Sequence, residues 1–185
     1  MIAIVWFLGA GGFLAPEVDT SLGTLPGPVQ VTGLDEPLPA FDYHCPLLSL
    51  PLVFGTTLTT IPAAVPYVNA ASEKVAVWRE RLGPAQGRRV GLVWSGSPGH
   101  KDDRQRSISL AALTALLHAG VDLVSLQKEV READRATLAA QPAIHDYGDS
   151  LEDFDDTAAL IANLDLVISV DTAVAHLAGA LGKPV

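Results

Sequence analysis

Apolar and polar residues alternate in a regular way from residue 72 to the end of the chain. Three short runs, "GLVW", "DLVSLQ" and "DLVISV", are mostly apolar, which is typical of strands buried on both faces. The longer stretches between them place apolar residues three and four apart, which is the period of an amphipathic helix. Strands that alternate with helices of this length predict βαβ units, so we expect an α/β fold with a Rossmann-like parallel sheet.

Five helices are predicted in this part of the chain. Ser72 and Ser109 precede stretches of helical period and are candidate N-caps, and Gly120 is a candidate stop. The stretch "DFDDTAALIANL" begins with acids, which the helix dipole favours in a first turn. The stretch "EVREADRATLAAQ" is highly charged, so we expect an exposed helix. The predicted helices cover residues 72–82, 109–120, 129–141, 153–164 and 172–182.

The chain has a different character before residue 73. Nine of the 13 prolines precede this point, and every lysine and arginine follows it. Residues 25–68 show no sustained helical period, and their prolines interrupt short apolar runs, as in extended segments and turns. We therefore expect residues 1–71 to be an incomplete domain piece with a linker, and residues 72–185 to be the folded domain.

Composition and charge exclude several classes of protein. The net charge of −9 makes the phosphate backbone of a nucleic acid an unsuitable partner. Cys45 is the only cysteine, so no internal disulfide can form, which fits a reducing compartment. Residues 2–14 are apolar but too short to span a bilayer, and they lack the basic start of a secretion signal. We expect a cytoplasmic protein with no membrane span.

Candidate chemistry lies where the predicted strands end. Ligands of open parallel sheets bind beyond the carboxyl ends of the strands. After the last strand, Asp171 and Thr172 lead directly into a helix, whose free N–H groups and dipole form an anion site. The loop after the first strand supplies the cations Lys101, Arg104 and Arg106. Together these residues predict a diphosphate pocket in which the Asp171 carboxylate accepts a hydrogen bond from a sugar hydroxyl.

The same residues allow a plainer interpretation. Asp171 could serve only to cap the helix that follows it, and the basic loop could be simply solvated. Residue spacing by itself does not choose between a diphosphate pocket and a capped helix, so both interpretations stay open at this point.

The end of the chain, "VISVDTAVAHLAGALGKPV", resembles the Asp-Thr-Gly-x-x-His-x-x-x-Ala motif of the family 9 glycosyltransferases, the heptosyltransferase group. The stretches "VGLVWSGSPGHKDDRQRSISLAAL" and "PLPAFDYHCPLLSLPLVFGTTLTTIP" look like those of related bacterial proteins in which such a domain follows tetratricopeptide repeats. The resemblance covers residues 25–185. It implies a GT-B fold, in which two Rossmann-like halves enclose the active site. The C-terminal half binds the nucleotide-sugar donor, with no metal and no other cofactor.

The resemblance also implies roles for individual residues. Asp171 would contact the donor sugar, and Thr172 with the next two N–H groups would hold the phosphates. Arg106 takes the place of the family's basic phosphate ligand, and Gln127 would lie near the nucleotide base. Ala173 departs from the motif, because heptosyltransferases usually have Gly there, and its methyl restricts a close backbone approach. The implied donor-binding residues are Arg106, Ser107, Gln127, Asp171, Thr172, Ala173, Val174 and His176.

Two other motifs favour structural interpretations. The stretch "IAIVWFLGAGGFLAP" carries Gly9, Gly11 and Gly12 after an apolar run, but the third glycine of a dinucleotide fingerprint is missing. The neighbouring acids Asp102 and Asp103 have no further carboxylate at metal-ligand spacing. We therefore expect no metal site there and interpret the pair as part of a solvated loop.

Two further arrangements lack the context that catalysis needs. His44 and Cys45 would point to opposite faces of a strand, so a nucleophile and its base are not expected there. Ser95, Asp171 and His176 could be drawn as a hydrolase triad, but the sequence has no Gly-x-Ser-x-Gly elbow. Neither arrangement predicts a catalytic site.

The sequence therefore predicts the nucleotide-binding half of a GT-B glycosyltransferase, preceded by a partial, Pro-rich piece of the acceptor half. The acceptor would be an unidentified glycan, lipid or protein, and the catalytic base is unknown. The alternative is a non-catalytic nucleotide-binding or scaffold module of a repeat protein. The final stretch "GKPV" is expected to open a further strand beside "DLVISV". Residues 1–24 match no acceptor half, so we expect a truncated fragment without transferase activity of its own.

Overall fold

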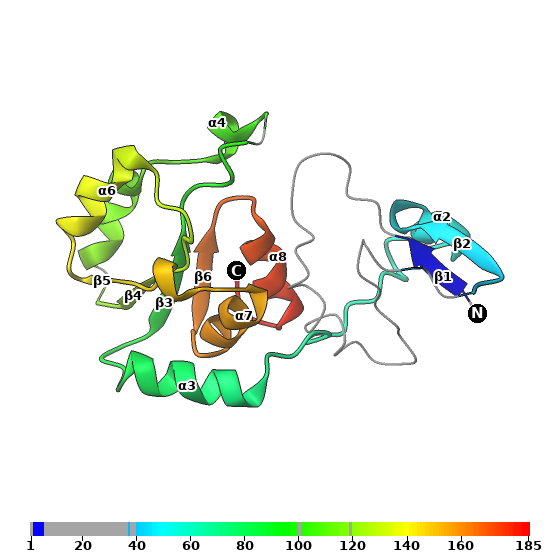
Figure 1. Ribbon diagram of the computed structural model, residues 1–185, viewed down its shortest axis with the longest axis horizontal. Helices are drawn as coiled ribbons and strands as arrows, with labels where there is room; N and C mark the ends of the chain where they lie inside the picture. Colours follow the sequence, from blue (N-terminus) through cyan, green and yellow to red (C-terminus); the bar gives the residue numbers. More distant parts are fainter. Residues whose placement is uncertain (1, 6–36, 38–39, 100, 119) are drawn as a thin grey trace.

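The computed structural model describes residues 2–5, 37, 40–99, 101–118 and 120–185. Its main body is a four-stranded sheet in the order β5-β4-β3-β6, in which every neighbouring pair is parallel (Figure 1). The strands are β3 (Arg89–Val93), β4 (Asp122–Ser125), β5 (Ile144–Asp146) and β6 (Leu166–Ser169). The predicted parallel sheet is confirmed. The short strand β5 is the one that the sequence pattern does not predict.

Helices connect the strands and pack against the sheet. The α-helices of this body are α3 (Ser72–Leu82), α4 (Asp103–Arg106), α5 (Leu110–Leu113), α6 (Glu132–Ala139), α7 (Phe154–Ala162) and α8 (Ala173–Ala180). Two 3₁₀ segments, η3 (Thr114–His118) and η4 (Gly148–Ser150), complete the connections. The order of strands and helices is that of βαβ units, as the sequence predicts.

The central strands β3 and β4 are buried on both faces. Because successive side chains of a strand point to opposite faces, Val93 and Val124 join one apolar cluster while Leu92 and Leu123 join another. The first cluster includes side chains of α3, α7 and α8, and the second includes side chains of α5 and the half-buried Leu138 of α6. The uniformly apolar strands of the sequence are explained by these two helical layers.

The helix predicted over residues 109–120 is only partly regular. Ser109 does occupy the N-cap position of α5, but its side chain makes no capping hydrogen bond in the described structure. After one α-helical turn the chain tightens into η3, and the Thr114 hydroxyl donates to the Ala111 carbonyl at 2.8 Å. Such a bond from a hydroxyl to the preceding turn competes with regular helix geometry. Gly120 follows with a φ of +67° and ends the segment as predicted.

Helix α6 is shorter and less exposed than predicted. It covers eight residues, and its Asp134 side chain is buried. The Asp134 carboxylate accepts hydrogen bonds from the Trp94 indole at 3.1 Å and from the Leu110 amide at 2.9 Å. The prediction of an exposed, charged helix is confirmed for most of α6, and Asp134 is the exception, since its buried carboxylate fixes α6 to the end of β3 and to α5.

The acids at the start of α7 act as predicted. Asp153 is the N-cap, and its carboxylate accepts from the Asp156 amide at 2.6 Å. It also binds the Lys74 ammonium of α3 at 2.9 Å. Burial alone would raise the pKa of Asp153, but the hydrogen bonds from Lys74 and the Asp156 amide outweigh it and lower that pKa. Helix α3 itself begins after Ala71 as N-cap, one residue before the predicted Ser72.

Both ends of this body are held by backbone contacts. The amides of Tyr67 and Val68 donate to the Ala180 carbonyl of α8, and the Val68 side chain is only 5% exposed. After α8 the last residues do not form the expected strand, although the Val167 amide of β6 donates to the Pro184 carbonyl at 3.0 Å. The final segment thus lies along the outer edge of β6.

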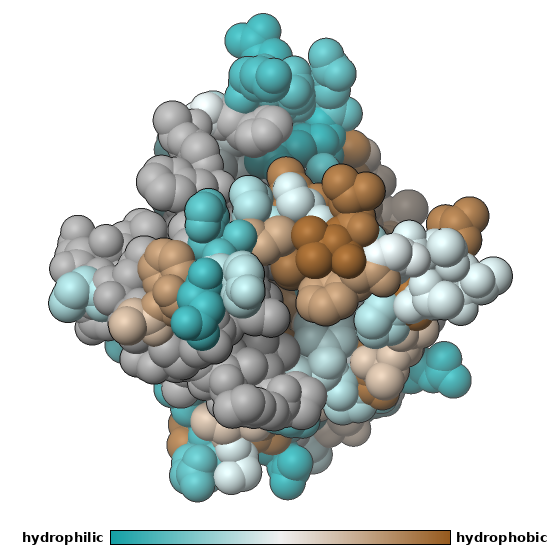
Figure 2. Space-filling model, turned by 90° about the vertical axis from the view of Figure 1, so that its right-hand side faces the viewer, coloured by the Kyte–Doolittle hydropathy of each residue, from teal (hydrophilic) through white to brown (hydrophobic). Residues whose placement is uncertain are grey.

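The N-terminal part contains a second, smaller unit. The strands β1 (Ile2–Val5) and β2 (Tyr43–Pro46) pair in parallel, and η2 (Leu47–Ser49) and α2 (Leu50–Val53) follow. Its side chains Leu48, Leu52 and Phe54 are exposed. Figure 2 shows the side of the molecule on which this unit lies, and apolar residues gather near the middle of that view. The glycines of the considered dinucleotide fingerprint, Gly9, Gly11 and Gly12, lie outside the described residues.

Candidate functional site

The carboxyl ends of β3 and β6 lie next to each other. The two strands pair in parallel, with Val93 opposite Ser169, so the loops that leave them share one edge of the sheet. Helix α4 and the start of α8 lie at the upper edge of the sheet in Figure 1. This is the edge at which ligands of open parallel sheets bind.

The turn between β6 and α8 contains the predicted motif. Thr172 is the N-cap of α8 with extended backbone angles, and its hydroxyl lies 3.0 Å from that of Ser169. The Asp171 carboxylate is 78% exposed and does not cap the helix. The structure therefore does not support the interpretation of Asp171 as a simple helix cap. The Asp171 carboxylate faces solvent at the rim of the turn.

The first amides of α8 point toward this rim. An α-helix has no internal acceptor for its first N–H groups, so those of Ala173 and Val174 lack one within α8. With the helix dipole they favour an anion at this position. Ala173 is exposed, so its methyl lies at the surface where an anion would approach. His176 lies one turn further, with Nε2 3.9 Å from an Asp171 carboxylate oxygen.

Arg106 links the two loops. The residue ends α4, and its Nη1 donates to the Asp171 carbonyl at 2.8 Å. Its guanidinium lies directly over Gly96, where a Cβ would overlap it. The structure thus brings together the cation and the turn that the sequence places in one site. Lys101 and Arg104, the other two predicted cations, are exposed in the same loop.

Ser107 and Asp103 lie behind Arg106 rather than at the surface of the site. The Ser107 hydroxyl accepts from the Gly96 amide at 3.1 Å and donates to Asp103 at 2.9 Å, so its bonds are used within the protein. Asp103 is only 6% exposed. The interpretation of the Asp102–Asp103 pair as a solvated loop is therefore wrong for Asp103, because arginine and serine side chains enclose it.

Gln127 holds the ends of β3 and β4 together. Its side-chain oxygen accepts from the amides of Trp94 and Ser95, and its nitrogen donates to the carbonyls of Ser95 and Glu129. The side chain is buried, and these four bonds use its polar atoms. The described geometry therefore gives Gln127 a structural role, and its position near a nucleotide base stays a prediction.

Ser95 has a buried hydroxyl at the end of β3. The residue is 2% exposed, and its Oγ has no hydrogen-bond partner among the described residues. The exposed His176 and Asp171 pair with each other and not with Ser95. The triad that could be drawn from Ser95, Asp171 and His176 therefore does not form in the described structure.

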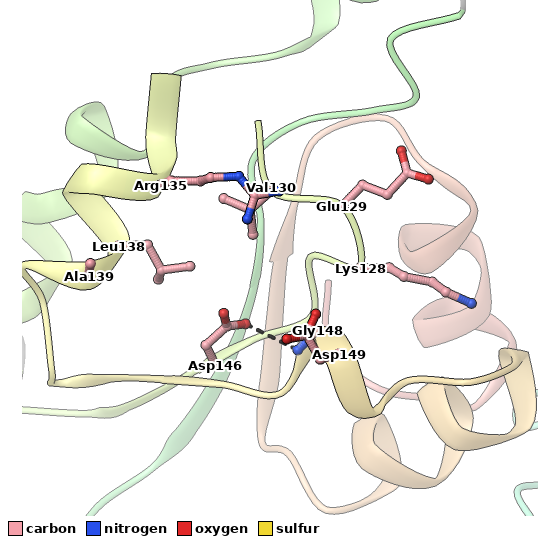
Figure 3. Close-up of a pocket in the computed structure, with 9 residues that line it drawn as sticks. All are labelled: Lys128, Glu129, Val130, Arg135, Leu138, Ala139, Asp146, Gly148 and Asp149. Carbon is pink, nitrogen blue, oxygen red and sulfur yellow. Dashed lines mark hydrogen bonds between the residues drawn. The ribbon is translucent and has the colours of Figure 1, made fainter. Parts of the chain in front are cut away.

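A cavity of about 620 Å³ lies beside the site, between α6 and the loops that follow β4 and β5 (Figure 3). The Asp146 carboxylate lines this cavity and accepts a hydrogen bond from the Gly148 amide at 3.1 Å. The sequence does not predict this cavity, because β5 has only three residues and is too short to show a pattern. Its lining residues are Lys128, Glu129, Val130, Arg135, Leu138, Ala139, Asp146, Gly148 and Asp149.

The described residues contain neither a metal-binding group of side chains nor a membrane-spanning helix. In the part of the chain that the structure describes, no three His, Cys, Asp or Glu side chains gather in a way that could hold a metal ion. In the same residues, no helix is both long and apolar enough to cross a bilayer.

The fold belongs to the class of α/β domains with a parallel sheet covered on both faces, and it matches a GT-B neighbour. E. coli ADP-heptose LPS heptosyltransferase II superposes with a TM-score of 0.50 at 19% identity, over 70% of this chain and 41% of that protein. The family model of glycosyltransferase family 9 (heptosyltransferase) matches residues 152–185, which contain α7, β6 and α8. The resemblance to family 9 is thereby confirmed for this stretch.

A curated relative covers more of the chain. Protein FlbA of Caulobacter vibrioides is 29% identical over an alignment of 153 residues, which covers 78% of this chain and 25% of that protein. The chain thus spans a quarter of the length of this relative and less than half of the heptosyltransferase.

Proposed function

We propose that residues 72–185 form the nucleotide-sugar-binding domain of a glycosyltransferase, with the donor diphosphate at the turn between β6 and α8. The observation that carries the proposal is the hydrogen bond from Arg106 to the Asp171 carbonyl. It joins a cation to the start of a helix at the carboxyl edge of a parallel sheet, which is a suitable place for a phosphate group. The family match over residues 152–185 includes the same turn.

The geometry suits the departure of a nucleoside diphosphate. Sugar transfer breaks the bond between the sugar C1 and a diphosphate oxygen, and the electron pair stays with the diphosphate. Groups that stabilise this developing negative charge lower the barrier. Arg106 and the first amides of α8 would supply that stabilisation, so the arrangement can act without a metal ion.

Other residues of the turn would orient the donor. The Thr172 hydroxyl would donate to a phosphate oxygen, and the exposed Asp171 carboxylate would accept from a sugar hydroxyl. His176 lies close enough to Asp171 to share that contact. The group that takes the proton of the acceptor is not assigned, and the acceptor itself is not identified.

The nucleoside of the donor would extend from the turn toward β4 and β5. Neighbouring strands lie about 4.8 Å apart, so the edge beside β4 is about 10 Å from β6. The cavity lined by Lys128, Asp146 and Gly148 lies in that direction. The E. coli neighbour acts on ADP-heptose by its name, so ADP is the first nucleotide to test.

Calorimetric titration tests the proposal. ADP, GDP and UDP are titrated into the protein in EDTA and again in Mg²⁺. We expect at least one of them to bind with the same affinity under both conditions, because the phosphate contacts come from protein groups. If none binds at millimolar concentration, the donor-site proposal fails. Binding that requires Mg²⁺ would contradict the metal-independent mechanism.

A second candidate function is a non-catalytic nucleotide-binding module. Ala173 favours it, since its exposed methyl stands where the motif has Gly and narrows the approach to the helix amides. A nucleotide-sugar that binds but is neither transferred nor hydrolysed by the protein would support this candidate. The association of the domain with tetratricopeptide repeats stays a prediction.

A further inference from the structure

A cluster of charged side chains lies behind Arg106. The Asp103 carboxylate accepts from the Ser107 hydroxyl and from the Arg131 guanidinium, and it lies 3.7 Å from Nε of Arg106. Arg131 also donates to Ser107 at 3.0 Å. The cluster therefore has one buried anion between two cations, and it fixes the loop after β3 to the start of α6.

We propose that Asp103 is the positioning residue of the donor-phosphate site, acting through Arg106. This inference rests on the proposed function. An arginine side chain loses rotamer entropy when it is fixed in one position. The Asp103 carboxylate attracts the Arg106 guanidinium from 3.7 Å, and Gly96 leaves the room that the guanidinium occupies, with its Nη1 on the Asp171 carbonyl. A phosphate that arrives at the turn meets a guanidinium that is already ordered, so less freedom is lost on binding.

The charge of Asp103 is maintained by its neighbours. Its burial would raise the pKa of the carboxyl, but the Ser107 hydrogen bond and the two guanidinium groups outweigh burial and lower the pKa below its ordinary value. The carboxylate is therefore ionised at neutral pH. Because one carboxylate lies between two guanidinium groups, the cluster keeps a net positive charge.

Positioning and simple electrostatics predict opposite effects of removing this charge. A buried carboxylate near a phosphate site repels the phosphate, so its loss should tighten binding if Coulomb repulsion decides the outcome. If Asp103 acts by fixing Arg106, its loss should weaken binding. The sign of the change in affinity thus separates the two explanations.

The test compares Asp103→Asn with Glu80→Gln, which removes one negative charge from an exposed side chain of α3. ADP and adenosine are titrated into each variant of the full chain, or UDP and uridine if the protein binds UDP. We expect Asp103→Asn to bind the diphosphate about tenfold more weakly and the nucleoside as tightly as the unchanged protein does. Glu80→Gln should match the unchanged protein with both ligands.

A double variant shows whether Asp103 acts through Arg106. In an Arg106→Ala background, adding Asp103→Asn should cause no further loss of diphosphate affinity. Asp103→Glu keeps the charge, displaces the carboxylate by one methylene, and should give a smaller loss that is again confined to the diphosphate. It replaces Asp103→Asn as the decisive variant if Asp103→Asn does not fold.

Three outcomes would overturn the inference. They are unchanged or tighter diphosphate binding, an equal loss for the nucleoside, and a full further loss in the Arg106→Ala background. If the unchanged protein binds none of the three nucleoside diphosphates, the proposed function fails. This result differs from the failure of the inference, in which the unchanged protein does bind a diphosphate.

Discussion

At the scale of single residues, the site depends on two glycines in different ways. A Cβ on Gly96 would meet the far end of the Arg106 side chain, which can move aside. A Cβ on Gly148 would lie 2.6 Å from the backbone oxygen of Gln127, which cannot move without shifting β4. Gly96 therefore leaves room for the functional side chain of Arg106, and Gly148 leaves room for the backbone of Gln127.

We expect Gly96→Ala and Gly148→Ala to separate binding from stability. Gly96→Ala should weaken nucleoside diphosphate binding and change the free energy of unfolding by less than about 0.5 kcal/mol. Gly148→Ala should lower the free energy of unfolding by about 1–3 kcal/mol, because overpacking forces the backbone to shift. Urea unfolding and calorimetric titration of both variants measure the two effects. Equal stability losses would contradict this assignment of roles.

The sequence predicts the surface of the site better than the cluster behind it. Arg106 and Asp171 meet as predicted because strand ends and a helix start are visible in the apolar pattern. The burial of Asp103 is not visible there, since a loop has no periodicity and its partner Arg131 is 28 residues away in the sequence. Gln127 is placed correctly at a strand end, but its bonds to the backbone depend on the sheet register.

At the scale of elements, an ion pair at the start of α7 adds to the apolar contact between α3 and α7. Lys74 binds Asp153 at 2.9 Å and Asp156 at 3.0 Å. Partial burial would lower the pKa of Lys74, but the hydrogen bonds to these two acids raise it above its ordinary value. The element pattern predicts the two helices but not their pairing, because it contains no long-range information.

We expect Asp153→Ala to lower the free energy of unfolding by about 1–2 kcal/mol, since it removes both the cap and the ion pair. The pKa of Asp153 is lowered on folding, so its contribution is present above the ordinary pKa of an aspartate. It is lost as the pH falls through the lower pKa of the folded state. The pKa of Lys74 is raised on folding, so its contribution to stability is present below the ordinary pKa of a lysine. That contribution is lost as the pH rises through the higher pKa of the folded state.

Urea unfolding at a series of pH values measures this dependence, with Glu152→Ala as the control for an exposed carboxylate next in sequence. The difference between Asp153→Ala and the unchanged protein should shrink toward acid. A difference that stays constant from neutral to strongly acidic pH would contradict the role of the ionised carboxylate.

At the scale of the whole molecule, the sheet and its two helical layers follow from the alternation of apolar strands and amphipathic helices. The boundary of the domain does not, because composition changes near residue 73 whereas packing begins earlier. Val68 is buried against the body, and two amides donate to Ala180. We propose that the folded unit includes residues 66–71 as well as residues 72–185.

A comparison of two shortened chains tests this boundary. We expect residues 66–185 to unfold at a higher urea concentration than residues 72–185, with a difference of about 1.5–3 kcal/mol from the burial of Val68. Val68→Ala should lower the stability of the longer chain by a large part of this difference. Equal stability of the two shortened chains would return the boundary to residue 72.

The central claim is that Arg106 and the start of α8 hold the donor diphosphate. The most direct test is the affinity for nucleoside diphosphate of Arg106→Ala compared with Lys101→Ala, since both remove one cation from the same loop. Arg106→Ala should cost about 1.5–3 kcal/mol of binding free energy by removing a charge-assisted contact, while Lys101→Ala removes an exposed charge and should cost little. Equal losses in the two variants, or a larger loss for Lys101→Ala, would contradict the account.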